Sequence, residues 1–263
     1  MTRIAIVSAM REELGALLQQ MPDEVPVVRG GREFYVGTLD GHDVVAVLSR
    51  VGKVAAATTA TLLAGEFGVG RAIFTGTAGG LHECARVGDV VIASAVLQHD
   101  MDASPLFPRH EVPLYGVDRF HADAALSTAV AGAARAVLDE AARRPNPDQS
   151  DGGGDALDAA ALRSFGIDAP RVHTGLVVSG DRFVATAGES AALRERLPDA
   201  LAVEMEGAAL GQVCHDMGMA FAIVRTISDR ADDSAHIDFT RFAESIASRY
   251  TLAIVRRCLR DLG

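Results

Sequence analysis

The order of apolar and polar positions along the chain predicts alternating strands and helices. Short runs rich in Val, Ile and Ala stop at Gly, Ser or Asp, and longer stretches with Ala and Leu at helical spacing lie between them. We expect strands at residues 3–8, 44–49, 71–75, 90–96, 172–178 and 220–226, and helices at residues 12–20, 53–67, 122–143, 188–195, 205–217 and 239–262. This alternation favours an α/β fold, in which helices pack outside a central doubly wound or mixed sheet.

One segment interrupts this pattern. Residues 143–157 include Pro145, Pro147 and three consecutive glycines, a composition typical of an exposed, flexible loop. The strand and helix patterns on both sides of the segment fit one layered sheet. We therefore predict a single domain over residues 1–263, with a flexible insertion near residues 143–157.

Composition narrows the range of partners and compartments. The formal net charge of −10 disfavours nucleic acid or an anionic membrane as a partner, because either would repel most of the surface. Cys84, Cys214 and Cys258 are odd in number and widely separated, which indicates neither a disulfide framework nor a zinc site. Charges from Arg11 onward come too early for a signal peptide, and no apolar run has the roughly 18 residues of a membrane span. We expect a cytoplasmic protein.

Residues that follow the predicted strands are candidates for chemistry, because ligands gather at the carboxyl ends of strands in open α/β sheets. Residues 75–80 follow the third strand and predict a tight turn that brings backbone N–H groups and the Thr77 hydroxyl near a ligand. The segment lacks the lysine of a phosphate-binding loop and the spacing of a dinucleotide-binding motif. A simple turn without a ligand is an equal alternative.

Two carboxylates, Glu204 and Glu206, flank Met205 at the start of a predicted helix. Acidic side chains at this place also stabilise the helix dipole, so capping alone explains them as well. In the functional interpretation, Glu206 accepts hydrogen bonds from sugar hydroxyls while Met205 packs on the ribose face.

Carboxylates follow two further strands. Ser228 and Asp229 end a buried apolar run, where Asp229 is either a cap or an acid that protonates a leaving group. Glu12 and Glu13 follow the first strand and are either ordinary acids of a first helical turn or catalytic groups.

Eight motifs in a fixed order carry a more specific signal. They are Ser-Ala-Met-Arg-Glu-Glu (8–13), Arg-Val-Gly-Lys-Val-Ala-Ala-Ala (50–57), Thr-Gly-Thr-Ala-Gly-Gly-Leu (75–81), Val-Gly-Asp-Val-Val (87–91), His-Asp-Met-Asp (99–102), Val-Ser-Gly-Asp-Arg-Phe-Val (178–184), Val-Glu-Met-Glu-Gly-Ala-Ala (203–209) and Thr-Ile-Ser-Asp (226–229). Apart from residues 103–165, the chain resembles the 5′-methylthioadenosine/S-adenosylhomocysteine nucleosidases of the wider purine nucleoside phosphorylase superfamily. The resemblance implies a three-layer α/β/α fold with a central mixed sheet, a homodimer, no metal ion and no organic cofactor.

The resemblance also implies residue roles. Glu13 would polarise the attacking water, Glu206 would bind the ribose, and Asp229 would donate a proton to purine N7. Further residues expected to contact the substrate are Thr77, Ala78, Gly79, Phe183, Val184, Glu204, Met205, Ser228 and Phe239. The implied reaction is hydrolysis of the N-glycosidic bond of 5′-methylthioadenosine, S-adenosylhomocysteine or a related 5′-substituted adenosine, with release of adenine.

Three alternatives stay open. Arg11 and residues 104–115 depart from the family pattern, so a futalosine-type nucleoside is another possible substrate. A phosphorylase would need cationic groups at an anion site, whereas the sequence offers Glu13 and no evident arginine beside Thr77. A non-catalytic nucleoside-binding protein on the same fold is the third alternative, and the presence of Glu13 together with the other two catalytic candidates argues against it.

Four polar residues receive a structural interpretation. Lys53 is expected at a helix start after Gly52. His99, Asp100 and Asp102 resemble a metal-binding set in isolation, but the family resemblance makes them scaffold or pocket-edge residues.

Overall fold

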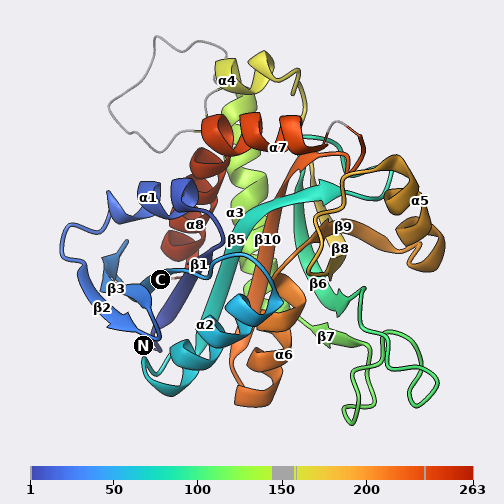
Figure 1. The fold of residues 1–263 in the computed structure, drawn as a ribbon. Helices are drawn as coiled ribbons and strands as arrows, with labels where there is room; N and C mark the ends of the chain where they lie inside the picture. The colour runs from blue at the N-terminus through green and yellow to red at the C-terminus, as the bar shows by residue number, and fades with distance from the viewer. Residues whose placement is uncertain (1, 144–156, 158, 234, 263) are drawn as a thin grey trace.

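The computed structural model describes residues 2–143, 157, 159–233 and 235–262 (Figure 1). Its strands are β1 (Ile4–Ser8), β2 (Val25–Arg29), β3 (Arg32–Leu39), β4 (His42–Leu48), β5 (Arg71–Gly80), β6 (Val90–Gln98), β7 (Arg119–His121), β8 (Val172–Ser179), β9 (Ala200–Glu204) and β10 (Ala220–Asp229). Its α-helices are α1 (Arg11–Leu18), α2 (Lys53–Gly65), α3 (Ala124–Arg143), α4 (Ala159–Ser164), α5 (Ala187–Arg196), α6 (Gly207–Met217), α7 (Ala235–Phe242) and α8 (Ser248–Leu262). Within these ranges, no helix combines the length and apolarity needed to cross a membrane. The predicted insertion lies almost entirely outside the described residues.

These strands form one mixed sheet, in which β5 and β6 each pair with three other strands. β5 pairs in parallel with β1 and with β10, and its last two residues pair antiparallel with β9. Because β10 also pairs with β6, and β6 continues through β8 to β9, strands β5, β10, β6, β8 and β9 close into a ring. The sheet extends from β5 through β1, β4, β3 and β2. The ring brings the ends of β5, β9 and β10 close together.

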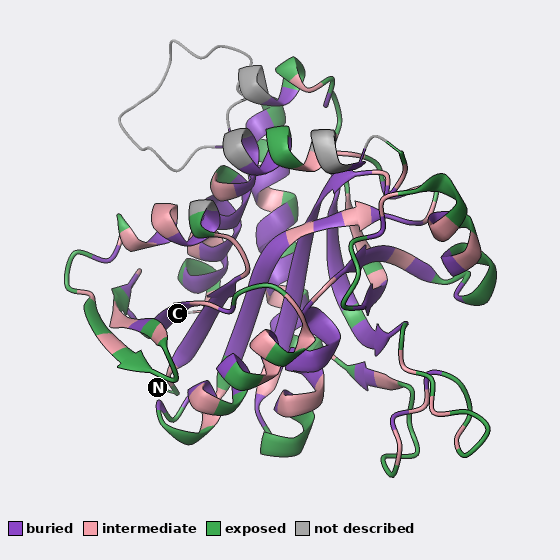
Figure 2. Ribbon diagram, in the orientation of Figure 1, coloured by how far each residue is buried: buried purple, intermediate pink, exposed green. Residues whose placement is uncertain are grey.

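Helices cover both faces of this sheet. Alternate residues of a strand point to opposite sides, and in the central strands both sets of side chains are apolar and are buried by helices. In β1, Ile4 and Ile6 pack into a core with α1, α3 and α8, whereas Ala5 and Val7 pack into a second core with α2 and α6. The central strands are buried along most of their length (Figure 2). The fold is therefore the three-layer α/β/α arrangement with a mixed sheet that the resemblance implies.

Three local predictions are wrong. Residues 75–80 form no tight turn, because β5 continues to Gly80: β10 pairs with it as far as Gly79, and β9 pairs with Gly79 and Gly80. Glu204 ends a strand, β9, and does not begin a helix. The helix expected at residues 239–262 is divided, since a π-helical turn at Ala243–Ala247 joins α7 to α8.

Candidate active site

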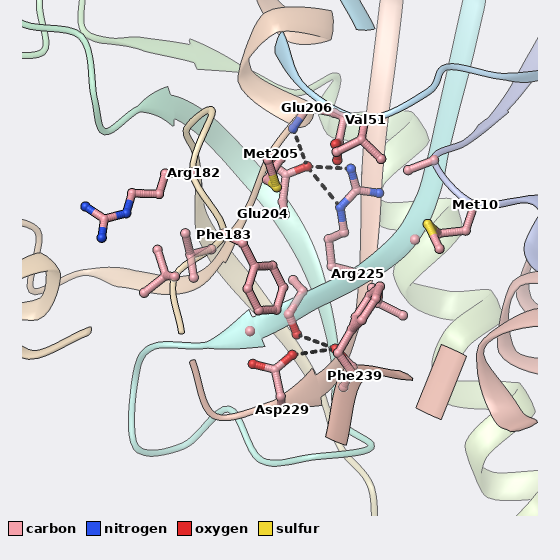
Figure 3. A pocket seen from close by; sticks show the side chains of 18 residues that line it. Met10, Val51, Arg182, Phe183, Glu204, Met205, Glu206, Arg225, Asp229 and Phe239 are labelled. Atoms are coloured by element: carbon pink, nitrogen blue, oxygen red, sulfur yellow. Dashed lines mark hydrogen bonds and ion pairs between the residues drawn. The ribbon is translucent and has the colours of Figure 1, made fainter. Parts of the chain in front are cut away.

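A cavity of about 300 Å³ opens where β5, β9 and β10 end (Figure 3). Eleven of the twelve residues expected to act on or contact a substrate line it: Thr77, Ala78, Gly79, Phe183, Val184, Glu204, Met205, Glu206, Ser228, Asp229 and Phe239. The twelfth, Glu13, does not line the cavity. These residues come from five separate stretches of the chain (77–79, 183–184, 204–206, 228–229 and 239), which meet at one end of the sheet.

Asp229 ends β10 and is fixed by donors on both carboxylate oxygens. Its Oδ1 accepts a hydrogen bond from the Ala231 N–H at 2.8 Å, and its Oδ2 accepts one from the Ser228 hydroxyl at 2.8 Å. A Cβ atom on Gly79 would lie 3.0 Å from Oδ1, so glycine at this position lets the carboxyl group lie close against β5. Asp229 is 2% exposed. The carboxyl group therefore has a fixed direction in a place shielded from bulk water.

Two aromatic rings form an apolar part of the wall. Phe183 follows β8 and Phe239 belongs to α7, and their ring centroids are 5.8 Å apart at an interplanar angle of 65°. Figure 3 shows the Phe183 ring between Asp229 on one side and the segment of Glu204, Met205 and Glu206 on the other. A planar aromatic ligand packs favourably on such rings, with a carboxyl group in reach at each end of the cavity.

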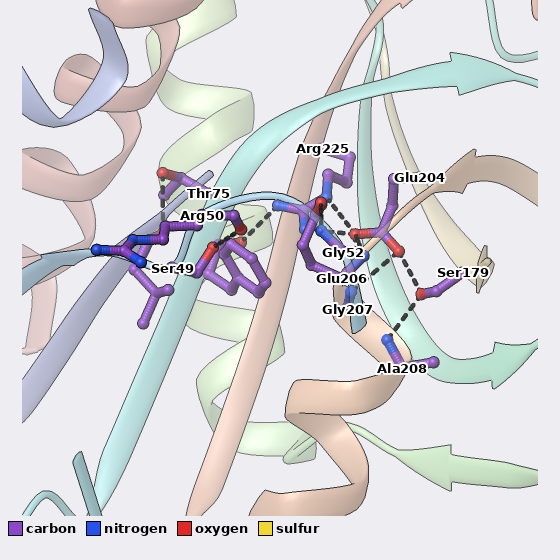
Figure 4. Close-up of polar contacts among 12 residues, drawn as sticks. Ser49, Arg50, Gly52, Thr75, Ser179, Glu204, Glu206, Gly207, Ala208 and Arg225 are labelled. Carbon is purple, nitrogen blue, oxygen red and sulfur yellow. Dashed lines mark hydrogen bonds and ion pairs between the residues drawn. The ribbon is translucent and has the colours of Figure 1, made fainter. Parts of the chain in front are cut away.

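Glu204 and Arg225 form a buried ion pair in the wall of the cavity (Figure 4). The Arg225 Nη2 and Nε atoms donate to Glu204 Oε2 at 2.6 Å and 3.2 Å, and the guanidinium lies over the Phe74 ring at 4.2 Å. The Gly207 N–H also donates to both oxygens of Glu204, and so does the Ser179 hydroxyl to one of them. Glu204 therefore binds many protein donors, and its role as a substrate ligand stays a prediction.

Glu206 is the N-cap residue of α6 and is 5% exposed. Its Oε1 accepts a hydrogen bond from the Gly52 N–H at 2.9 Å, which connects α6 to the segment before α2. Burial and, second, the neighbouring Glu204 carboxylate raise the pKa of Glu206 to about 7. The group is therefore close to changing its charge at neutral pH.

Glu13 lies in α1, directly behind the cavity wall, and is 1% exposed. A Cβ atom on Gly76 would lie 3.8 Å from Glu13 Oε1 and 2.8 Å from Arg225 Nη1. Since Gly76 lines the cavity, Glu13 is separated from it at this point only by a residue without a side chain. Its role in activating water stays a prediction.

Several residues of the wall were not predicted from the sequence, namely Ala9, Met10, Val51, Gly76, Arg182, Val203 and Arg225. The expectation of no arginine beside Thr77 is wrong, because the pairing of β10 with β5 places Arg225 opposite Gly76, next to Thr77. A single charged residue inside the apolar run of β10 is the signal that could have revealed it. Its positive charge is balanced by Glu204.

Comparison with known proteins agrees with this geometry. A model of the phosphorylase superfamily matches residues 3–260. The 5′-methylthioadenosine/S-adenosylhomocysteine nucleosidase of Neisseria meningitidis, solved with methylthio-immucillin-A, is 32% identical over 99% of this chain and 100% of that one, with a TM-score of 0.80. The S-adenosylhomocysteine nucleosidase of Streptococcus pyogenes, solved with 5-methylthiotubericidin, is 28% identical over 100% and 98% of the two chains, with a TM-score of 0.81.

A relative with another substrate is similar to nearly the same degree. The futalosine hydrolase of Helicobacter pylori is 27% identical over 97% of both chains, with a TM-score of 0.76. The family match and the identity over whole chains nevertheless agree with the eight motifs of the sequence. The chain belongs to the phosphorylase superfamily and, within it, to the family of 5′-methylthioadenosine/S-adenosylhomocysteine nucleosidases.

Proposed function

We propose that the protein is a purine nucleosidase that hydrolyses the N-glycosidic bond of 5′-methylthioadenosine, S-adenosylhomocysteine or a related 5′-substituted adenosine and releases adenine. The observation that carries the proposal is the placement of Asp229 and Glu206 at two ends of one cavity with an aromatic wall between them. Solved relatives bind methylthio-immucillin-A and 5-methylthiotubericidin, two ligands whose names both include a methylthio group.

The chemistry of this bond explains why two carboxyl groups are needed. Cleavage builds positive charge on the ribosyl ring and negative charge on the departing purine. Asp229 would donate a proton to N7 of the base, while Glu206 would accept hydrogen bonds from ribose hydroxyls and stabilise the sugar cation. Met205 would pack on the ribose, and Phe183, Val184 and Phe239 would contact the base. The backbone of Ala78 and Gly79 and the hydroxyls of Thr77 and Ser228 complete the proposed contacts.

Water is the nucleophile that this site favours over phosphate. Glu13 lies behind Gly76, where a carboxylate would polarise water and repel an anion. Arg225 is the cation nearest to this point in the cavity wall, and its charge is balanced by Glu204 at 2.6 Å. A phosphate clamp needs cationic groups with unused donors. Hydrolysis is therefore the proposed reaction, and phosphorolysis is the alternative.

The direct experiment is an assay of base release by the purified protein. Adenine should appear from 5′-methylthioadenosine and S-adenosylhomocysteine, with 5′-deoxyadenosine and futalosine as comparison substrates. A large preference for futalosine would assign the chain to that activity, for which the Helicobacter pylori relative provides the precedent. Binding without turnover of any nucleoside would leave a non-catalytic nucleoside-binding protein.

The raised pKa of Glu206 predicts how kcat/KM depends on pH. Since burial raises this pKa to about 7, the carboxylate that accepts ribose hydroxyls is lost as the pH falls through 7. We expect kcat/KM to fall below about pH 7 in wild type, because this parameter reports ionisation in the free enzyme. In Glu206→Gln this acid limb should be absent, with kcat/KM lowered at every pH. An unchanged limb in the variant would assign it to another group.

We also propose a homodimer, supported by exposed apolar side chains in the segment between β6 and β7. Leu106 and Leu114 are 84% and 92% exposed, and Tyr115 and Val117 of the same segment are 38% and 39% exposed, so several large apolar side chains lie together as they do in interaction surfaces. Tyr115 donates a hydrogen bond to Asp216 at 2.8 Å and so connects this segment to the end of α6.

Replacing both Leu106 and Leu114 with Asp should convert the dimer to a monomer in light scattering at micromolar concentration. The matched control is Val28→Asp, which places the same charge at an exposed valine on the edge strand β2 and should leave the dimer intact. A wild-type monomer, or a dimer that survives the double substitution, would contradict this surface assignment.

The proposed substrates also suggest a place in the cell. Cleavage of 5′-methylthioadenosine leaves adenine and a methylthio sugar, which connects the protein to methionine salvage. Because these nucleosides arise inside cells, we propose a cytoplasmic location. Fluorescence microscopy of a tagged protein in its host would test this.

A further inference from the structure

Lys53 is the only lysine among the 25 Lys and Arg residues of the chain. The other 24 of these residues are arginines, so lysine at position 53 is an exception in this sequence. Lys53 is the first residue of α2, and its side chain is only 15% exposed. A single lysine whose side chain is mostly buried needs a physical reason for being lysine and not arginine.

The contacts of Lys53 provide it. Nζ donates to Asp100 Oδ1 at 2.6 Å and to Gln98 Oε1 at 3.1 Å, and lies 3.9 Å from Asp181 Oδ2. Two hydrogen-bond acceptors and a second carboxylate at ion-pair distance, all around one nitrogen, suit a compact ammonium better than a planar guanidinium. The backbone N–H of Lys53 also donates to Asp181 Oδ1 at 2.8 Å.

A second set of hydrogen bonds extends this cluster. The Asp181 N–H donates to Asp100 Oδ2 at 2.9 Å, and Gln98 Nε2 donates to Gln212 Oε1 of α6 at 2.7 Å. Lys53 and its acceptors thus connect the start of α2, the end of β6, the segment after β8 and helix α6.

Two of the connected segments form the wall of the cavity. Val51 precedes Gly52 on one side, and Arg182, Phe183 and Val184 follow Asp181 on the other. Between these segments, the Gly52 N–H donates to Glu206 Oε1 at 2.9 Å. A Cβ atom on Gly52 would lie 3.2 Å from Asp181 Oδ1, which shows how closely the segments approach.

We infer that Lys53 is a positioning residue for the proposed reaction: with Asp100 and Asp181 it holds the Gly52 N–H on Glu206 and keeps the two wall segments together. The inference rests on the proposed function and goes beyond it, because Lys53 itself does not line the cavity. It also explains two acidic residues of the His-Asp-Met-Asp and Ser-Gly-Asp motifs to which the proposed mechanism gives no role.

Electrostatics make the lysine necessary. Burial raises the pKa of Asp100, but hydrogen bonds from Lys53 and from the Asp181 N–H outweigh that effect and hold the pKa below its usual value. Asp100 and Asp181 are therefore two neighbouring carboxylates with one ammonium between them. Without Lys53 they would repel each other and separate the segments.

The first test is Lys53→Met, which keeps the length of the side chain and removes its charge. We expect kcat/KM to fall about 10- to 100-fold, since small misplacements in an active site have effects of this size. The double variant Lys53→Met with Asp100→Asn should recover several-fold, because it removes the repulsion that the single change creates. Arg257→Met is the control, since it removes a cation of α8 that pairs with the surface carboxylates Glu140 and Asp261 and should leave the kinetics unchanged.

The pH profile separates a positioning role from a merely structural one. The groups that face Glu206 are Glu204 on β9, Arg225 on β10 and the backbone N–H groups of Gly52 and Met205, and of these only the Gly52 N–H depends on Lys53. Loss of this hydrogen bond should raise the pKa of Glu206 and move the acid limb of kcat/KM up by about one pH unit. A lower melting temperature with an unchanged profile in every variant would overturn the inference.

A readout without substrate keeps this test independent of the proposed function. The Gly52 amide hydrogen should exchange slowly with solvent in wild type and at least tenfold faster in Lys53→Met, while amides of β1 are unchanged. If Lys53→Met fails to fold, Asp181→Asn weakens the same contacts and should show the same acceleration. Equal exchange in wild type and a folded variant would refute the inference, whereas a wild type without nucleosidase activity would refute only the proposed function.

Discussion

Replacing Asp229 with Asn should lower kcat by roughly 10²- to 10⁴-fold, the usual contribution of a general acid. The carboxyl group is 2% exposed and accepts hydrogen bonds from the Ala231 N–H and the Ser228 hydroxyl. An amide has nearly the same shape: its oxygen can accept the bond from the Ala231 N–H, and the Ser228 hydroxyl can rotate to accept one from the NH₂, so the fold should survive. KM should change less than kcat, because the amide NH₂ can still donate to N7 of the purine.

The measurement is steady-state kinetics on the folded variant, with Asp233→Asn as a control. Asp233 is exposed and lies four residues beyond the proposed acid, so its substitution tests for a general effect of removing a charge in this segment. A folded Asp229→Asn protein with a near-normal kcat would eliminate Asp229 as the acid, and the purine would have to leave without a proton from this residue.

Glu13→Gln is expected to lower kcat by about 10²-fold or more with little change in KM. Glu13 lies behind Gly76 and not in the cavity wall, so it would contact the attacking water and not the bound nucleoside. Glutamine fills the same space but is a weaker acceptor of the proton that water loses. A loss confined to kcat is the pattern of an interaction made only in the transition state.

Glu33→Gln is a suitable control, because Glu33 is an exposed residue of β3 whose carboxylate accepts a hydrogen bond from Tyr35. Near-normal kcat in the control and a large loss in Glu13→Gln would support water activation by Glu13. A raised KM with unchanged kcat in Glu13→Gln would instead show that this residue contributes to substrate binding.

The sequence predicts much of the sheet because its buried strands are strongly apolar. It did not predict the hairpin of β2 and β3, since β2 is a mostly exposed edge strand that contains Pro26. The turn signal was nevertheless present: Gly30 and Gly31 both have positive φ, as a two-residue hairpin turn requires. Strand β9 was missed for a different reason, because five residues carry too little periodicity to distinguish a strand from a helix start.

Site residues could be predicted from the sequence where they are polar residues that directly follow an apolar run. Asp229 and Glu206 are of this kind. Arg225 is different, because its position in the middle of β10 acquires meaning only when the pairing of β10 with β5 places it opposite Gly76. The acceptors of Lys53 also could not be predicted from the sequence. They lie 45, 47 and 128 residues away from it, and only the folding of the sheet brings them close to Lys53.

The most direct test of the central claim is the dependence of base release on phosphate. Purified protein is incubated with 5′-methylthioadenosine in phosphate-free buffer and in buffer with added phosphate, and both the base and the sugar product are followed. Hydrolysis predicts equal rates of adenine release under both conditions and the free sugar as the only sugar product. An absolute requirement for phosphate, or a sugar 1-phosphate as product, would contradict the account and identify a phosphorylase.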